Sequence, residues 1–205
     1  MNLKELGIHS STGWSVSSFT NGDILFPITG PFRAGGSKAA LDIKGPDNKT
    51  LSISAVGIGG GVGVGPKSMK LDGLTPVLEK GFESWMSITR GVVNYFATSQ
   101  IPSITTRILG VNRQELCAED LTGGCLYTQT LGGSVGAGIG ASAGLVWFID
   151  VSPYVFLGLL LAPAAPGFAA YLIANTKAVA FAAGLQMSSL TPEAGATHCV
   201  LAIKK

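Results

Sequence analysis

Apolar and small residues alternate along much of this chain with a period of two. In the first run, glycine occupies the odd positions from 57 to 65, and valine or isoleucine occupies most of the even ones. Successive side chains of a β-strand point to opposite faces, so this pattern predicts a strand with one bare face and one aliphatic face. Runs at 131–149 and 178–188 alternate in the same way. The small faces let two backbones, or a backbone and a ligand, approach closely.

The run at 131–149 is too long for an ordinary strand. At about 3.3 Å per residue it would span roughly 63 Å, so we expect a bend, a bulge or a break. Val146 and Phe148 fill the otherwise bare face and mark the expected place. The glycines of this run also fit the GxxxG spacing of packed membrane helices. The period of two accounts for more positions, so strands are the preferred interpretation.

Turn residues divide the N-terminal part into hairpins. Asn21-Gly22 is typical of a type I′ turn and predicts a hairpin over 15–28. Residues 45–48, Gly-Pro-Asp-Asn, predict a second turn between two further strands. The other elements expected by pattern are strands at 101–111 and 198–203 and a polar loop at 113–120.

One segment has helical spacing instead. Apolar residues recur at intervals of three or four between 74 and 96, with Thr75 as a possible cap and Pro76 at the first helical position. We expect one helix over about 75–96. Neither an internal repeat nor a long linker is present. The chain is therefore predicted to be a single β-rich domain over 1–205, a glycine-rich β-barrel or β-sandwich.

Residues 151–176 form an uninterrupted uncharged segment between Asp150 and Lys177. Its length and apolarity match a transmembrane helix of about 20 residues. Prolines interrupt it, however, and Pro163 to Gly167 has the composition of a turn. We expect an apolar hairpin or loop with two arms. Three interpretations stay open: a hairpin that enters or touches lipid, a part of the ordinary core, or an oligomer interface.

The composition agrees with a protein that must hide apolar surface. Charged residues make up 13% of the chain, against roughly 25% in an ordinary soluble domain. Of the 26 charged residues, 21 lie in the first 120 positions, so the C-terminal part is the apolar one. The net charge of +2, with no cluster of lysine and arginine, excludes a nucleic-acid interface.

The N-terminal residues lack the apolar core and cleavage site of a secretory signal. We expect a cytoplasmic protein, a protein exported by a signal-independent route, or one whose signal has been removed, and membrane association is compatible with each. The three cysteines are expected to be buried free thiols, with a Cys117–Cys125 disulfide as the alternative.

Candidate chemistry is sparse. Ser134 lies in a G-x-S-x-G sequence, and Asp150 and His198 follow in the chain order of a serine hydrolase. The alternating strands and helices of that fold are missing, so hydrolysis is the last of our hypotheses. We expect no cofactor, and two histidines with no matching cysteine spacing predict no metal site.

Our leading hypothesis is a β protein that binds a membrane or lipid, with an oligomeric pore-forming effector or toxin as one form of it. The alternatives are a soluble barrel that binds a small apolar ligand and a structural homo-oligomer. The expected partners are thus a lipid bilayer or an apolar ligand, together with further copies of this chain. The expected membrane or partner contacts are Trp147, Phe148, Tyr154, Phe156, Leu159, Leu160, Phe168 and Tyr171.

Overall fold

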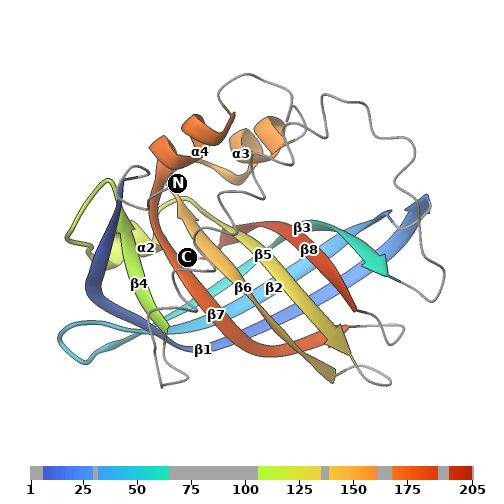
Figure 1. Ribbon diagram of the computed structural model, residues 1–205, viewed down its shortest axis with the longest axis horizontal. Helices are drawn as coiled ribbons and strands as arrows, with labels where there is room; N and C mark the ends of the chain where they lie inside the picture. Colours follow the sequence, from blue (N-terminus) through green and yellow to red (C-terminus); the bar gives the residue numbers. More distant parts are fainter. Residues whose placement is uncertain are drawn as a thin grey trace.

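The computed structural model describes residues 7–29, 32–64, 106–134, 139–160, 168–188 and 194–204, and these form a closed β-barrel (Figure 1). The strands are β1 Ile8–Thr29, β2 Phe32–Lys44, β3 Thr50–Val64, β4 Thr106–Val111, β5 Cys125–Ser134, β6 Ile139–Ile149, β7 Thr176–Ser188 and β8 Ala194–Ile203. The helices are α2 Ala118–Thr122, α3 Pro153–Leu160 and α4 Phe168–Asn175. The prediction of a mainly β protein, with barrel as one of its two forms, is confirmed. The helix predicted at 75–96 lies outside the described residues.

The strands follow the ring order β1-β2-β3-β8-β5-β6-β7-β4, and β4 pairs back onto β1. Neighbours in this ring are antiparallel. β4 is only six residues long, and next to its start β1 pairs directly with β7 in parallel, from Thr20 to Asp23. The last strand of the chain, β8, therefore lies between β3 and β5 rather than at an edge.

The interior is filled with apolar side chains at the end of the barrel that holds α2, which we call the α2 end. Leu121 of α2 packs into this core and is fully buried. Trp14 of β1 joins the core, and its indole Nε1–H donates to the carbonyl of Leu116, 2.9 Å away, in the loop before α2. The short helix and its loop thus close this end. Other members of this inner core are Val16, Phe19, Leu41, Ile43, Ile53, Ile108, Leu126, Val146, Phe148 and Leu201.

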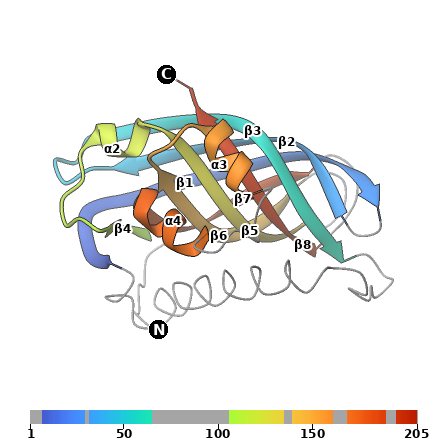
Figure 2. The ribbon, with the colours of Figure 1, turned by 90° about the horizontal axis from the view of Figure 1, so that it is seen from above.

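A second core lies on the outside of the barrel, where α3 and α4 cover the strands (Figure 2). Phe156 of α3 and Leu172 of α4 are completely buried there. They pack with side chains that alternate with the inner set along the same strands, so the barrel wall is buried on both sides. The strand residues of this outer core are Ile8, Leu109, Val111, Cys125, Tyr127, Leu145, Trp147, Ile149, Val179 and Val200.

The long alternation at 131–149 is divided between two strands, and the bulge expected near Val146 and Phe148 is present, because the register of β6 with β7 shifts between Phe148 and Ile149. β5 ends at Ser134 and β6 begins at Ile139, with an antiparallel pairing between them. Val146 and Phe148 continue β6 into the apolar α2 end, where their side chains belong to the inner core. The preference for strands over packed helices is confirmed for the glycine runs in the described residues.

The hairpin predicted at Asn21-Gly22, in contrast, is wrong. Both residues lie inside the continuous strand β1, where Asn21 pairs with Ala39 of β2 and with Gln186 of β7. Pairing on both sides holds Asn21 extended and fully buried, so tertiary contacts override the local turn preference. The second turn is confirmed: Gly45 N–H donates to the carbonyl of Lys49, 2.9 Å away, and Asn48 has the positive φ, 63°, that this turn requires.

The apolar segment 151–176 has two arms, as expected, and both arms are short helices, α3 and α4. The turn predicted at 163–167 lies outside the described residues. The three cysteines form no disulfide among the described residues; Cys125 and Cys199 are buried, as predicted, whereas Cys117 is exposed. Within the part of the chain that the structure describes, no helix is long and apolar enough to cross a membrane.

Candidate functional site

The outer surface of the barrel is uncharged over β3, β8 and β5. Strand register aligns three rows of positions here: Ile58–Val200–Tyr127, then Gly60–His198–Gln129, then Val62–Ala196–Leu131. We call these nine positions the uncharged wall. Two of its large apolar side chains are exposed: Ile58 is 50% accessible and Leu131 is 70% accessible. Large exposed apolar side chains that share one face of a protein are typical of a surface that meets another apolar surface.

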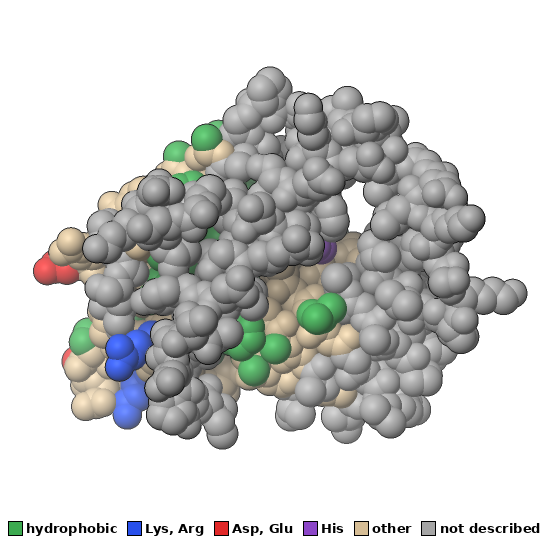
Figure 3. Space-filling model, viewed as in Figure 1, with side chains coloured by type: hydrophobic (Ala, Val, Ile, Leu, Met, Phe, Trp, Pro, Cys, Tyr) green, Lys and Arg blue, Asp and Glu red, His purple; other side chains and the backbone are tan. Residues whose placement is uncertain are grey.

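The outer face of β1 and β2, in contrast, is polar. Thr20, Lys38 and Lys44 are exposed there, and Asp42 accepts hydrogen bonds from the hydroxyls of Ser52 at 2.7 Å and Ser18 at 2.8 Å. These two hydrogen bonds, with Ser52 the stronger, hold the pKa of Asp42 below its usual value. On another face, shown in Figure 3, the charged side chains of the described residues gather at one end. The barrel therefore has two chemically different sides.

Two hydrogen-bonded pairs of side chains lie on the uncharged wall and beneath α3. The indole Nε1–H of Trp147 donates to Gln129 Oε1 at 2.9 Å. The hydroxyl of Tyr127 lies 2.8 Å from His198 Nδ1. Phe156 of α3 packs on the Tyr127 ring, with centroids 5.1 Å apart. These contacts connect the covered part of the wall to its half-buried histidine.

Burial changes the acid–base properties of the two titratable side chains in these pairs, Tyr127 and His198. It raises the pKa of Tyr127 above its usual range, and hydrogen bonding from Gln129 opposes part of that rise. It lowers the pKa of His198 below its usual value near 6.5, because a low-dielectric environment disfavours the charged imidazolium. Both rings are therefore neutral at pH 7.

The predicted contact residues fall into three groups. Phe148 is buried inside the barrel, and Trp147 and Phe156 are buried between the wall and the helices, so in this fold their surfaces are used in the core. Tyr154 is 85% exposed, and Tyr171 is half-buried. The side chains of three further predicted contacts lie outside the described residues: Leu159, Leu160 and Phe168. The neighbour of Tyr154, Val155, is 51% exposed and was missed by sequence reasoning.

Ile58 and Leu131 were also missed. Each appeared in the sequence as one apolar position in an alternating strand, which is the usual pattern of core. A signal was present nevertheless: the outward positions of β3, β8 and β5 carry no charged residue, whereas those of β2 include Lys38, Asp42 and Lys44.

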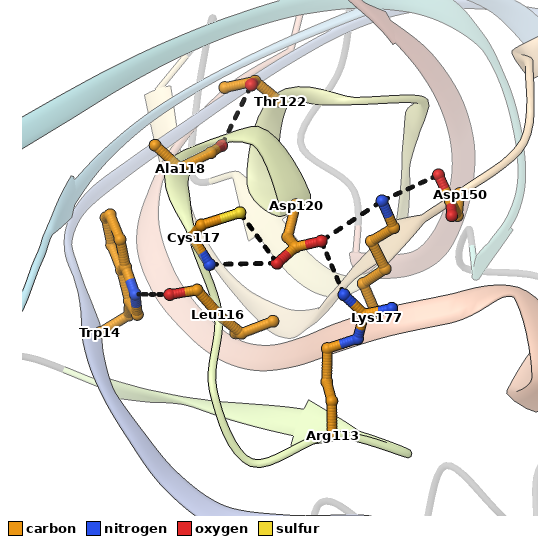
Figure 4. Close-up of polar contacts among 9 residues, drawn as sticks. All are labelled: Trp14, Arg113, Leu116, Cys117, Ala118, Asp120, Thr122, Asp150 and Lys177. Carbon is orange, nitrogen blue, oxygen red and sulfur yellow. Dashed lines mark hydrogen bonds and ion pairs between the residues drawn. The ribbon is translucent and has the colours of Figure 1, made fainter.

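The α2 end holds a network of charged side chains (Figure 4). Asp120 accepts from Arg113 Nη1 at 2.6 Å and from the backbone N–H and thiol of Cys117 at 3.0 and 3.1 Å. Lys177 Nζ lies 3.4 Å from Asp120 and 2.9 Å from Asp150. Burial acts to raise the pKa of Asp120, but the Cys117 hydrogen bonds and the Arg113 charge hold it below its usual value. This network joins α2 to the start of β7 and is structural.

The serine hydrolase triad is not assembled. Ser134 ends β5 and pairs with Gly140 at the start of β6, whereas Asp150 directly follows the other end of β6. The intervening strand of eleven residues separates their backbones by roughly 30 Å at about 3.3 Å per residue. Asp150 pairs with Lys177, and His198 with Tyr127. Among the described residues there is also no group of three side chains able to hold a metal ion.

No protein-family model, no curated protein and no solved structure matches this chain. The candidate site therefore depends on the geometry of the barrel itself: an uncharged wall with two exposed apolar side chains, a half-buried neutral histidine in its middle row, and the exposed residues of α3 nearby.

The barrel interior beyond the apolar core is lined by small polar residues, and two of their hydroxyls lack a hydrogen-bond partner among the described residues. The hydroxyls of Thr130 and Thr197 form a hydrogen bond with each other, with their oxygens 2.6 Å apart. Thr128 Oγ1 and Ser142 Oγ are buried without such a partner. A buried hydroxyl that has lost its water and gained no partner costs about 1 to 3 kcal/mol.

The Thr128→Val variant is therefore expected to raise the free energy of unfolding by about 1 kcal/mol, because valine has the same shape and no hydroxyl to desolvate. Urea unfolding followed by tryptophan fluorescence measures this. Thr130→Val is the matched control, since it breaks the contact with Thr197 and should destabilise by about 1 to 2 kcal/mol. A loss of stability in Thr128→Val would mean that its hydroxyl does have a partner.

Proposed function

We propose that this protein binds a lipid membrane through the uncharged wall of its barrel, together with the exposed residues of α3. The observation that carries the proposal is the exposure of Ile58 and Leu131 on a surface without charge. Tyr154 and Val155 on α3 add exposed apolar surface. A tyrosine has an apolar ring and a polar tip, which suits the boundary between lipid and water.

Transfer of these side chains into lipid supplies enough free energy for binding. A fully transferred leucine, isoleucine or valine contributes about 1.5 to 3 kcal/mol, and Ile58, Val155 and Leu131 are 50%, 51% and 70% exposed before binding. Three such side chains give several kcal/mol, which corresponds to weak, reversible association of one barrel. Association of several copies at the membrane would multiply this affinity.

The two-sided surface favours docking by one wall over insertion of the whole barrel. A membrane-spanning barrel carries an apolar band around its full circumference. Here Lys38, Asp42 and Lys44 occupy outward positions of β2, and a lysine at the bilayer midplane costs about 2 to 4 kcal/mol. Pore formation by a single barrel of this shape is therefore not part of the proposal.

The test is flotation of the purified protein with neutral phosphatidylcholine vesicles that contain a trapped dye. The parent is expected to float with the vesicles without releasing the dye. Leu131→Asp places a charge on the wall and is expected to weaken binding at least tenfold, since burying an unpaired carboxylate costs several kcal/mol. The matched control is Ala40→Asp, which adds the same charge at an exposed position of β2 and should leave binding unchanged.

Equal binding by Leu131→Asp and the parent would remove the uncharged wall as the contact surface. Failure of the parent to bind any vesicles would overturn the proposal. In that case the apolar wall would be expected to join copies of this chain, and light scattering without detergent would give a mass that is a multiple of 21.0 kDa. Release of the dye would instead point to pores built from several chains.

A further inference from the structure

The segment that holds α3 and α4 leaves the barrel and returns to it at one place. It follows Ile149 of β6 and ends at Thr176 of β7, and these two residues are paired. The backbone N–H of Asp150 donates to the carbonyl of Asn175, 2.7 Å away, and Lys177 Nζ lies 2.9 Å from the Asp150 carboxylate. The ladder between β6 and β7 is therefore closed at the base of the helices, and their movement would break no strand pairing among the described residues.

Above this base, apolar packing holds the helices on the barrel. Phe156 of α3 and Leu172 of α4 are fully buried in the outer core, and Ile173 packs against it. Asn112, which follows β4, donates from Nδ2 to the carbonyl of Ile173 at 3.2 Å. Residues 151–176 carry no charge, so their side chains form no ion pair with the strands. Apolar packing of this kind is favourable in water, but lipid chains are apolar too and can take the place of either partner.

The strand surface under the helices has the same character as the uncharged wall. Tyr127 and Val200 belong to both, because they lie in the first row of the wall and also in the outer core. Leu145, Trp147 and Val179 extend the outer core across β6 and β7. The helices thus cover a continuation of the surface for which we propose membrane contact (Figure 2).

The sides of the helices that face away from the barrel are uncharged as well. On α3, Tyr154 is 85% exposed and Val155 is 51% exposed. Gly158 of the same helix is exposed, and a Cβ there would meet no atom within 4 Å. On α4, the exposed positions include Ala170 and Ala174. A helix that is apolar on every side is normally surrounded by protein or by lipid, so lipid is a suitable second environment for α3 and α4.

We propose that α3 and α4 form a cover that leaves the outer core when the barrel docks on a membrane. The helices turn about their base at Asp150 and Asn175 and enter the lipid, and the strand surface around Trp147 then meets the acyl chains directly. This rests on the proposed membrane binding and adds a change of conformation to it. In water, release would expose the outer core and is unfavourable. At the membrane, lipid covers both surfaces, so the cover opens only there.

The first test measures how close lipid comes to Trp147. This residue is fully buried in the outer core with Phe156 and Leu172. A closed cover keeps the indole away from the acyl chains by the thickness of a helix, about 10 Å, whereas an open cover allows contact. With that layer of about 10 Å removed, we expect vesicles of phosphatidylcholine with brominated acyl chains to quench at least about half of the Trp147 fluorescence. The Trp147→Phe variant, measured in parallel, assigns the signal.

The second test loosens the cover. The Phe156→Leu variant retains a similar affinity for lipid but loses the ring contact with Tyr127, in which the centroids lie 5.1 Å apart. We expect this variant to bind unlabelled phosphatidylcholine vesicles about fivefold more tightly than the parent, because its closed cover is weakened by about 1 kcal/mol. Tyr154→Leu makes the same replacement on the exposed side of α3 and is expected to bind within about twofold of the parent.

The outcomes separate this inference from the proposed function. A vesicle-bound parent whose Trp147 is not quenched would overturn the opening of the cover and leave membrane binding intact. Equal or weaker binding by Phe156→Leu would also overturn it, because the closed form would then be the one that binds. The same gain in Tyr154→Leu as in Phe156→Leu would assign the gain to leucine itself and remove this support. No binding of the parent to any vesicles would overturn both proposals.

Discussion

The Phe156→Ala variant is expected to lose about 3 to 5 kcal/mol of its free energy of unfolding. Phe156 is fully buried between α3 and the barrel wall and packs on the ring of Tyr127. Truncation of a buried phenylalanine removes its transfer free energy and leaves a cavity. The loss would also free α3, because this side chain is its deepest contact with the outer core. Denaturant unfolding of the parent and the variant, monitored by circular dichroism, measures the difference.

Tyr154→Ala is the matched control on the same helix. Tyr154 is 85% exposed, so its removal is expected to change stability by less than about 0.5 kcal/mol. The effect on membrane binding should be the opposite. Tyr154→Ala is expected to bind vesicles more weakly than the parent, although its stability is unchanged. Small and equal losses of stability in both variants would mean that α3 does not form part of the folded core.

The Gly144→Ala variant is expected to be destabilised by about 3 kcal/mol, although it adds only a methyl group. Gly144 of β6 pairs with Thr130 of β5. A Cβ at Gly144 would overlap the carbonyl oxygen of Gln129 and lie 2.7 Å from the Thr130 Cα. Both obstacles are backbone atoms of the neighbouring strand and cannot rotate away, so the strands must separate. Urea unfolding at equilibrium gives the loss.

Gly36→Ala is the control for this substitution. Gly36 also lies in a paired strand, β2, but a Cβ there would meet no atom within 4 Å. Alanine is expected to be neutral or stabilising by about 0.5 kcal/mol, because it reduces the conformational freedom of the unfolded chain. If both variants lost similar amounts, the close approach of β5 and β6 at Gly144 would not be the cause.

The strands and their faces could be predicted because alternation is a local property of the sequence. The pattern at 57–65 and 178–188 identified two strands, and the small even-numbered residues of β7 do lie toward the interior, as Ala178 and Ala180 show. The ring order could not be predicted, because the position of β8 between β3 and β5 depends on pairings over more than 60 residues. The prediction at Asn21-Gly22 failed for the same reason, because one pairing partner of Asn21, Gln186 of β7, is distant in sequence.

The candidate site was predictable only in part. Charge depletion correctly marked 151–176 as apolar, but core and lipid contact require the same residue types. Phe156 and Tyr154 lie two residues apart on one helix, and only the packing of α3 makes the first buried and the second exposed. Gln129 and Tyr127 gave no signal at all, because their hydrogen bonds with Trp147 and His198 exist only once the strands β5, β6 and β8 are adjacent.

The position of β8 has a consequence for biosynthesis. A ribosome makes β3 and β5 well before Ala194–Ile203, and both strands keep an unpaired side until that segment emerges. During this interval, unsatisfied backbone groups on these two strands are available to other nascent chains. The ring closes only when its last-made strand is inserted between two older ones, so a chain truncated before β8 should be captured by chaperones or aggregate.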